Sequence, residues 1–248
     1  MVVKIAFITG GTRGIGKAVV KKLYNEGYHV VATYNKNKSL ADTIIKELGG
    51  KRIIFFQLDL MKPEPSISHI AEYIEENYGK LDVLVNNAAV FNTKPFEKMT
   101  LEEWKLTLQV NLTGPFIVIK KLLPLLKRSG NASIINMASL AGVTGNVFAS
   151  ADYVASKAGL IGLTKKLAVE LAVYGIRVNA IAPSLVETDL VRSLIDTDEK
   201  RERIRKLHPL GLIISPEDIA ETVSFLADPS RSRAITGTVI NVNAGRYT

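Results

Sequence analysis

Tyr153 and Lys157 stand four residues apart, and Ser139 lies 14 residues upstream of the tyrosine at the end of an apolar run. In a helix, positions i and i+4 share one face, so the ammonium would lie beside the phenol. A neighbouring cation favours phenolate and lowers the pKa of a tyrosine from its usual value of about 10. The serine hydroxyl is placed to polarise the same substrate oxygen. This pattern predicts proton exchange with an alcohol or a ketone, although such a pair also occurs by chance in many helices.

The amino-terminal end of the chain carries a second chemical signal. An apolar run at 3–8 is followed at once by the segment 9–16, TGGTRGIG, which opens an amphipathic pattern. Glycines let a backbone turn tightly and approach a pyrophosphate, and the free N–H groups of a helix N-terminus favour its negative charge. Glycines also serve ordinary turns, but this loop lies at the first strand–helix junction, where doubly wound sheets bind dinucleotides. We therefore expect a dinucleotide site here.

The residues after the second predicted strand, 29–34, bear on which dinucleotide binds. An NAD site usually presents an Asp or Glu to the ribose 2′-hydroxyl about 20 residues beyond the loop. Here the chain reads Tyr34-Asn35-Lys36-Asn37-Lys38, without an acid, and Arg13 lies in the loop itself. Cations without a carboxylate suit a 2′-phosphate, so NADP(H) is favoured over NAD(H); the lysines also fit a plain solvated loop.

Length and composition limit the remaining classes. The chain has 248 residues, of which 47% are hydrophobic and 23% charged, as expected of one α/β domain with a sizeable core. It contains no cysteine, which excludes disulfides and thiolate metal sites, and its three histidines show no metal-ligand spacing. We predict no metal site.

The net charge of +8 is spread over the predicted helices rather than gathered beside aromatic residues. This pattern favours a solvated surface that attracts an anionic cofactor or substrate, and it argues against nucleic-acid binding. No apolar run is long enough to span a bilayer, and the chain enters a strand without a separate leader, so we expect no membrane association and a cytoplasmic location.

Strand-like apolar runs alternate with helical patterns along the whole chain. Such alternation implies parallel strands joined by right-handed crossovers, with helices on both faces of the sheet. The predicted strands are 3–8, 29–34, 52–57, 81–85, 133–137, 176–181 and 238–242. The predicted helical stretches are 14–26, 40–48, 67–77, 101–126, 153–174, 191–207 and 216–226. We see no repeat and no linker, and predict a single domain over 1–248.

Two long helical stretches, 104–126 and 153–174, are apolar over more than one face. One face can pack on the sheet and another on a partner subunit, so a homo-oligomer, a tetramer or a dimer, is expected; a thick core would give the same pattern. Pro115 and Pro124 should kink or interrupt the first stretch. The irregular segment 184–212, which is rich in charge, should overhang the carboxyl ends of the strands as a substrate lid.

Taken together, the glycine loop, the run Asn-Asn-Ala-Ala at 86–89, Asn111, Ser139 and the Tyr153–Lys157 pair resemble the short-chain dehydrogenase/reductase family in its compact form of about 250 residues. The match extends over nearly the whole chain. It implies a doubly wound Rossmann-type sheet of seven parallel strands in a three-layer α/β/α arrangement. It also implies hydride transfer with a nicotinamide cofactor.

The resemblance implies roles for individual residues. Tyr153 would be the general acid in reduction, Lys157 the cation that lowers its pKa and a ligand of the nicotinamide ribose, and Ser139 the orienter of the carbonyl. Asn111 would support the proton relay by holding a water near the lysine; a helix cap or kink is the alternative. The implied cofactor-binding residues are Gly10, Thr12, Arg13, Gly14, Ile15, Gly16, Tyr34, Asn35, Asp59, Leu60, Asn86, Ala88, Tyr153, Lys157, Pro183, Val186 and Thr188.

Two of these assignments have simpler readings, because Asp59 also fits a turn and Thr188 a helix N-cap. The chain departs from the family pattern at Ala89 and Ser184, where glycine is usual, and at Asn-Ala-Gly in 243–245. A β-carbon at Ser184 restricts the backbone beside the nicotinamide.

Within the family the chain is most similar to 3-oxoacyl-[acyl-carrier-protein] reductases, which implies reduction of a 3-oxoacyl thioester. Lys127 and Arg128 suit contact with an acidic carrier protein, whereas Tyr174 stands where a basic residue is often found. A coenzyme A thioester or another small carbonyl or alcohol fits as well. A sugar or secondary-alcohol dehydrogenase and a non-catalytic dinucleotide-binding regulator remain as alternatives.

Overall fold

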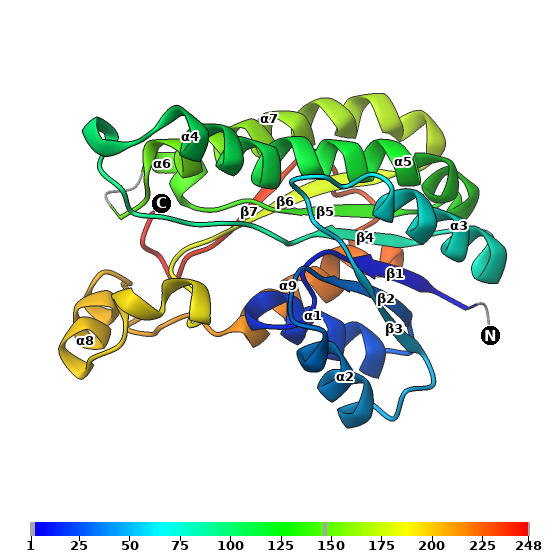
Figure 1. Ribbon diagram of the computed structural model, residues 1–248, viewed down its shortest axis with the longest axis horizontal. Coiled ribbons are helices and arrows are strands. Elements are labelled where there is room, and N and C mark those ends of the chain that lie inside the picture. The colour runs from blue at the N-terminus through cyan, green and yellow to red at the C-terminus, as the bar shows by residue number, and fades with distance from the viewer. Residues whose placement is uncertain (1–2, 146–147, 248) are drawn as a thin grey trace.

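The computed structural model describes residues 3–145 and 148–247, and Figure 1 shows its three layers. One sheet of parallel strands forms the middle layer, in the order β3-β2-β1-β4-β5-β6-β7. The strand order reverses between β1 and β4, which is where a doubly wound sheet opens a crevice at its carboxyl edge. The predicted fold class is therefore confirmed.

Every predicted strand is present, and each boundary lies within two residues of the prediction. β1, β5 and β6 are buried along their whole length, because helices cover both faces of the sheet and leave no polar side to alternate with. The strands are β1 (Ile5–Ile8), β2 (His29–Tyr34), β3 (Ile53–Gln57), β4 (Val83–Asn86), β5 (Ser133–Met137), β6 (Arg177–Pro183) and β7 (Val239–Val242).

The helices lie in two layers, one on each face of the sheet (Figure 1). α3, α5 and α7 pack on one face around Leu84, Leu122 and Ile134, and α1, α2 and α9 pack on the other around Ile8 and Val223. The helices of these layers are α1 (Gly14–Asn25), α2 (Lys38–Glu47), α3 (Ser66–Tyr78), α4 (Leu101–Leu108), α5 (Gly114–Ser129), α6 (Ala141–Thr144), α7 (Ala151–Leu171), α9 (Pro216–Ala227) and α10 (Pro229–Ser232). Short 3-10 turns are η1 (Phe96–Lys98) and η3 (Ala172–Tyr174).

The helical stretch predicted over 101–126 is divided, but not at its prolines. A capping box between Thr100 and Glu103 starts α4, and a π-helical turn, η2 (Gln109–Thr113), follows. Pro115 lies in the first turn of α5, where its missing N–H is harmless, and α5 continues through Pro124. The interruption therefore precedes both prolines and centres on Asn111.

The prediction of a single helix over 191–207 is wrong. The structure has a 3-10 segment η4 (Asp189–Leu194), a break, and then the short helix α8 (Asp198–Lys206), which Thr197 caps. The backbone at Val191 is not helical. A small separate cluster of Leu185, Ile195 and Ile204 supports this part of the chain, which lies outside the layers (Figure 1). The apolar residues at helical spacing thus belong to two short elements and not to one helix.

Candidate active site

The predicted site residues gather at the carboxyl edge of the sheet. Gly10 follows β1, Ser139 follows β5, and Pro183 ends β6. Tyr34 and Asn86 end β2 and β4, and the predicted cofactor residues that follow β2, β3 and β4 are Asn35, Asp59, Leu60 and Ala88. Strands that run in the same direction bring residues distant in sequence to one edge, and the strand-order reversal lies in its middle.

The glycine loop has a shape that only glycine permits. Gly10 and Gly14 have positive φ angles of 69° and 49°. A β-carbon at Gly16 would lie 2.0 Å from the carbonyl oxygen of Gly10, so the start of α1 packs directly on the loop. A helix N-terminus this close to an open backbone loop fits a pyrophosphate.

Neighbouring strands hold this loop in place. Thr9 Oγ1 accepts hydrogen bonds of 3.0 Å from the backbone N–H groups of Asn87 and Ala88. Asn87 Nδ2 donates in turn to the carbonyl oxygens of Thr9 and Gly10, and the Gly10 N–H donates to Thr33 Oγ1. Asn87, which sequence reasoning left out of the site residues, is therefore the link between β4 and the cradle.

The surroundings of the cradle suit an anionic dinucleotide. The first turn of α1 contains no acid, and Arg13, Lys36 and Lys38 are exposed, with no ion pair to any described residue. Thr188 covers Gly14, where an added β-carbon would lie 3.0 Å from Thr188 Cγ2. These residues fit the cofactor, because the backbone is open, the positive charges are free and no carboxylate opposes a phosphate.

Not every predicted cofactor residue has a free side chain. The Asp59 carboxylate accepts the N–H of Met61 at 2.9 Å, so it closes a turn although it stays exposed. Asn86 is buried and its Nδ2 donates to Asn136 Oδ1, while its own Oδ1 has no partner among the described residues. Val186 is buried and its backbone pairs with that of Ile214. Its side chain is therefore not free to contact a cofactor.

Tyr153 and Lys157 share one buried face of α7, as the spacing predicted. The Lys157 Nζ lies 5.6 Å from the centre of the Tyr153 ring and donates to the Met137 carbonyl oxygen at 2.7 Å. The Phe91 ring packs edge-on against Tyr153, with 4.9 Å between ring centres. The Ser139 hydroxyl lies close enough to the tyrosine hydroxyl to favour its charged form. The three side chains thus meet where β5 ends.

The electrostatics differ from the expectation, and the predicted lowering of the Tyr153 pKa is wrong for this arrangement. Burial raises the pKa of Tyr153 to about 12, and the nearby Ser139 hydroxyl lowers this pKa only in part. Burial also lowers the pKa of Lys157 to about 7, so its ammonium is only partly populated at neutral pH. Desolvation therefore disfavours the charged form of both side chains.

Asn111 is fully buried in the π-helical turn, and its side chain is engaged. Its Oδ1 accepts the Val90 N–H at 2.9 Å, and its Nδ2 donates to the Val90 carbonyl oxygen and to Ser156 Oγ. Ser156 donates to the carbonyl oxygen of Tyr153 at 2.8 Å. The amide therefore connects the loop after β4 to the helix that carries the tyrosine.

Asp152, which sequence reasoning missed, is a buried carboxylate beside Tyr153. Hydrogen bonds outweigh burial, which alone would raise the pKa of Asp152, and they lower that pKa below its ordinary value. The donors are the side chains of Ser150, Thr107 and Asn92 and the backbone N–H of Tyr153. An Asp directly before a predicted helix was the available signal, but its partners lie up to 60 residues away.

Within 3–145 and 148–247, no His, Cys, Asp and Glu side chains gather in threes in a way that could hold a metal ion. None of the helices in the same ranges is long and apolar enough to cross a membrane.

Comparison with known proteins shows the family of the chain. The profile of the family described as Enoyl-(Acyl carrier protein) reductase matches residues 10–247. The chain is 38% identical over 245 residues to the 3-oxoacyl-[acyl-carrier-protein] reductase FabG of Staphylococcus aureus, with 98% of each chain covered. It is 39% identical over 247 residues to the FabG of Aquifex aeolicus, covering 98% of this chain and 97% of that one. The 3-oxoacyl-[acyl-carrier-protein] reductase of Synechocystis is 35% identical over 244 residues, covering 98% and 96%.

Proposed function

The chain belongs to the short-chain dehydrogenase/reductase family of oxidoreductases that act with a nicotinamide dinucleotide, and from that premise we propose that it reduces the ketone of a 3-oxoacyl thioester to a secondary alcohol. The printed names of its full-length relatives support this substrate class. The observation that carries the proposal is the buried Tyr153, with Lys157 on the same helix face and Ser139 beside its hydroxyl, at the sheet edge that holds the glycine cradle.

When bound, the reduced nicotinamide supplies the hydride that adds to the carbonyl carbon. Tyr153 donates its proton to the carbonyl oxygen as the carbon–oxygen bond becomes single, and Ser139 orients that oxygen. An alkoxide is a stronger base than a phenolate, so a phenol with a pKa of about 12 still protonates it. The reverse reaction needs the phenolate, which is scarce at neutral pH. The raised pKa therefore keeps Tyr153 in the protonated form that reduction requires.

Lys157 and Asn111 serve the proton path in this proposal. With a pKa of about 7, Lys157 exchanges protons readily near neutral pH, and its place behind Tyr153 suits a ribose ligand. Asn111 acts as a positioning residue, since its amide links Val90 to Ser156 and through it to Tyr153. The water that Asn111 would hold stays a prediction.

NADPH is the proposed hydride donor. The exposed cations Arg13, Lys36 and Lys38 flank the edge where β2 ends, and Asn35 stands there in place of a carboxylate. Arg and Lys side chains suit the extra phosphate of this cofactor, while a ribose 2′-hydroxyl would lack its usual acidic partner.

The segment 184–212 is the proposed lid of a single-domain protein. Thr188 already touches the glycine loop, and α8 lies outside the layers on its own small apolar cluster. Glu187 and Arg201 form an ion pair within the segment. Its two ends are tied to the body, since the Ser184 N–H donates to the Val242 carbonyl oxygen and the Leu210 N–H to the Ala244 carbonyl oxygen, so motion over the site would be confined to the part between them.

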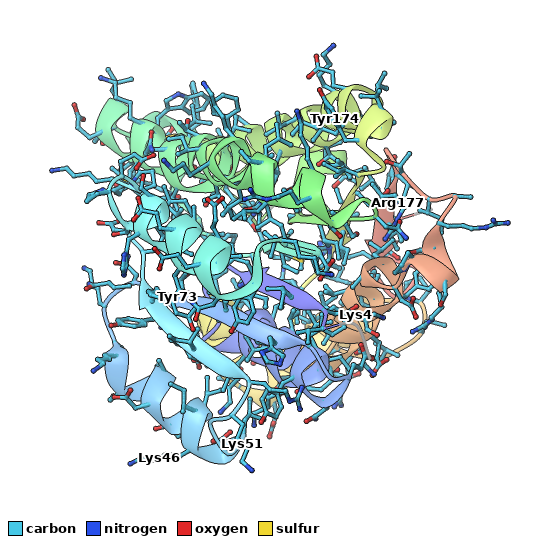
Figure 2. All side chains as sticks on the ribbon, turned by 90° about the vertical axis from the view of Figure 1, so that its right-hand side faces the viewer. Lys4, Lys46, Lys51, Tyr73, Tyr174 and Arg177 are labelled. Atoms are coloured by element: carbon cyan, nitrogen blue, oxygen red, sulfur yellow. The ribbon has the colours of Figure 1, made fainter. Side chains whose placement is uncertain are left out.

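An acyl carrier protein is the proposed natural carrier of the thioester, and the basic end of α5 bears on how it docks. Lys127 Nζ lies 3.6 Å from the ring centre of Tyr174, and Arg128 pairs with Glu75. Figure 2 shows Tyr174 and Arg177 at the edge where the strands begin. Tyr174 is separated from Tyr153 by the length of α7, roughly 30 Å. A carrier that docks there would serve the site of a second subunit.

This geometry agrees with the homo-oligomer that we propose. Val169 and Val173 on the outer face of α7 and η3 are 78% and 80% exposed, and Phe116 of α5 is 46% exposed. Exposed apolar residues on neighbouring helices suit burial between subunits. The tetramer, the dimer and the cytoplasmic location stay predictions.

Steady-state kinetics test the proposed function. Purified protein should oxidise NADPH when given an acetoacetyl thioester, and should prefer NADPH to NADH in kcat/KM. A secondary alcohol and a sugar with NADP+ serve as comparison substrates. Oxidation of those alcohols with no turnover of any 3-oxoacyl thioester would contradict the proposal, and a preference for NADH would contradict its cofactor part.

A further inference from the structure

Three polar side chains from distant parts of the chain meet where β6 ends. Ser184 follows β6, and its hydroxyl oxygen accepts a hydrogen bond of 3.2 Å from Arg246 Nη1. His208 Nε2 lies 2.9 Å from the same oxygen. Ser184 stands where the family usually has glycine, so the hydroxyl that joins the other two is a feature of this chain. We call this group the Ser184 cluster.

Among the described residues, the positive charge of the cluster has no carboxylate counter-ion. Arg246 is half-buried, burial lowers its pKa, and none of the described carboxylates lies within 4.0 Å of its guanidinium. The group instead lies over the Phe148 ring, with 5.4 Å between the guanidinium carbon and the ring centre. Only one of its five N–H groups has a partner among the described residues. A desolvated, unpaired guanidinium favours an anion strongly.

His208 adds a second unsatisfied group. It is 1% exposed, and its pKa is lowered by burial and by the charge of Arg246, so it is neutral at pH 7. The backbone of Leu212 is near enough to favour its charged form, but no described group meets hydrogen-bond geometry with Nδ1. A buried nitrogen without a partner is rare in folded proteins and marks a place where a ligand or a water completes the structure.

The Ser184 cluster borders the substrate side of the candidate active site. β5 and β6 are neighbours in the sheet, and the Leu140 N–H donates to the Pro183 carbonyl oxygen at 2.8 Å. Ser139 and Ser184 therefore end adjacent strands. Phe148 lies in the segment between Ser139 and Tyr153, and His208 lies at the end of the proposed lid.

We infer that Ser184, His208 and Arg246 form a subsite that binds an anionic oxygen group, a carboxylate or a phosphate, on the substrate. This inference rests on the proposed function, since it adds a preference to the same site. Arg246 supplies the charge through a planar fork that matches two oxygens, and Ser184 fixes the fork. A carboxylate at the far end of the acyl chain and the phosphate of a pantetheine arm share this chemistry.

Calorimetric titration tests the subsite without turnover. The probes are glutarate and its neutral diamide, added to the wild type, Arg246→Met and Arg246→Lys. We expect the wild type to bind glutarate but not the diamide, with affinity roughly 10- to 100-fold weaker in Arg246→Met, the usual worth of hydrogen bonds to a charged group. Arg246→Lys keeps the charge and should retain part of the affinity.

Arg233→Met is the matched control, because it removes an exposed arginine elsewhere on the surface and should bind glutarate like the wild type. Equal affinity in the wild type and Arg246→Met overturns the subsite, as does absence of glutarate binding in the wild type. A lower Tm in Arg246→Met with unchanged glutarate binding also overturns it, because the cluster would then only fasten the tail to the lid.

Kinetics distinguish the source of the anion. Three substrates are compared: a 3-oxohexanoyl thioester of N-acetylcysteamine, the same thioester with a terminal carboxylate, and the 3-oxohexanoyl thioester of 4′-phosphopantetheine. One of the two anionic substrates should have a higher kcat/KM than the neutral one, and Arg246→Met should bring that ratio towards one. A ratio that Arg246→Met leaves unchanged overturns the inference. Failure of all three thioesters alongside specific glutarate binding would instead contradict the proposed function.

Discussion

Tyr153 and Lys157 illustrate how burial changes the chemistry that a residue pair suggests. Their spacing correctly predicted a shared helix face, since a helical repeat depends only on local sequence. The direction of the Tyr153 pKa shift was not predictable, because it depends on how deeply residues from other strands and helices cover the pair. Solvent exclusion raises one pKa to about 12 and lowers the other to about 7.

The depressed pKa of Lys157 should be measurable as a pH dependence of stability. Between about pH 7 and the unfolded value of 10.5, the unfolded chain binds more protons at this residue than the folded one. The free energy of unfolding should therefore rise with pH in this window, by up to about 1.4 kcal/mol per pH unit. Lys157→Met should remove this contribution, as measured by urea unfolding at several pH values. Parallel curves for both proteins would contradict the shift.

Asp152 shows what sequence reasoning misses when partners are remote. Its four donors come from three segments, so its carboxylate holds α4, the loop after β4 and the start of α7 together. Asp152→Asn should lower the free energy of unfolding by about 1–3 kcal/mol, because hydrogen bonds to a charged group are lost. Denaturant unfolding measures this, with the exposed Asp42→Asn as the control. Equal losses in both variants would mean that the network contributes nothing special.

At the scale of elements, the strands were predictable and the irregular helices were not. A buried parallel strand is a short apolar run between turn residues, which is visible in the sequence. The π-helical turn at Gln109–Thr113 keeps a helical pattern of side chains, so only the backbone reveals it. The stretch 191–207 carries apolar residues at helical spacing that serve two elements. Short helices such as α6 contain too few residues for a helical hydrophobic pattern to be recognised in the sequence.

The junction of β1 and α1 makes a specific prediction about cofactor binding. Gly16→Ala would place a methyl group 2.0 Å from the Gly10 carbonyl oxygen, so the loop must shift. Backbone strain of roughly 1–3 kcal/mol should weaken NADPH binding about 10- to 100-fold, as measured by titration. Gly162→Ala is the control, because that position in α7 is open and the change should stabilise the helix slightly. Unchanged NADPH affinity in Gly16→Ala would place the cofactor elsewhere.

The proposed catalytic site and the proposed carrier-docking end lie at opposite edges of the sheet. The proton-transfer group and the Ser184 cluster lie at the carboxyl edge, while Tyr174 lies at the other (Figure 2). The sequence already indicated that two long helices are apolar over more than the face that packs on the sheet. The number of subunits was not predictable, because it depends on how such faces pack between chains. One chain alone leaves Val169 and Val173 in water.

Assembly is testable by light scattering. The wild type should have a mass at least twice the 27.1 kDa of the chain, because exposed apolar faces of α5 and α7 would be buried between copies. Val169→Asp should reduce the mass by placing charge in that contact, and Val3→Asp, at the exposed amino-terminal end, should not. A wild-type particle of 27.1 kDa would rule out the oligomer.

The most direct test of the account is the reduction rate of an acetoacetyl thioester with NADPH after removal of a single hydroxyl group. Tyr153→Phe keeps the ring that packs on Phe91 but lacks the proton, so kcat/KM should fall by at least ~10²-fold, the usual worth of general acid catalysis. Tyr174→Phe, which loses the same group at the opposite edge, should react like the wild type. A Tyr153→Phe enzyme as fast as the wild type would show that another group donates the proton.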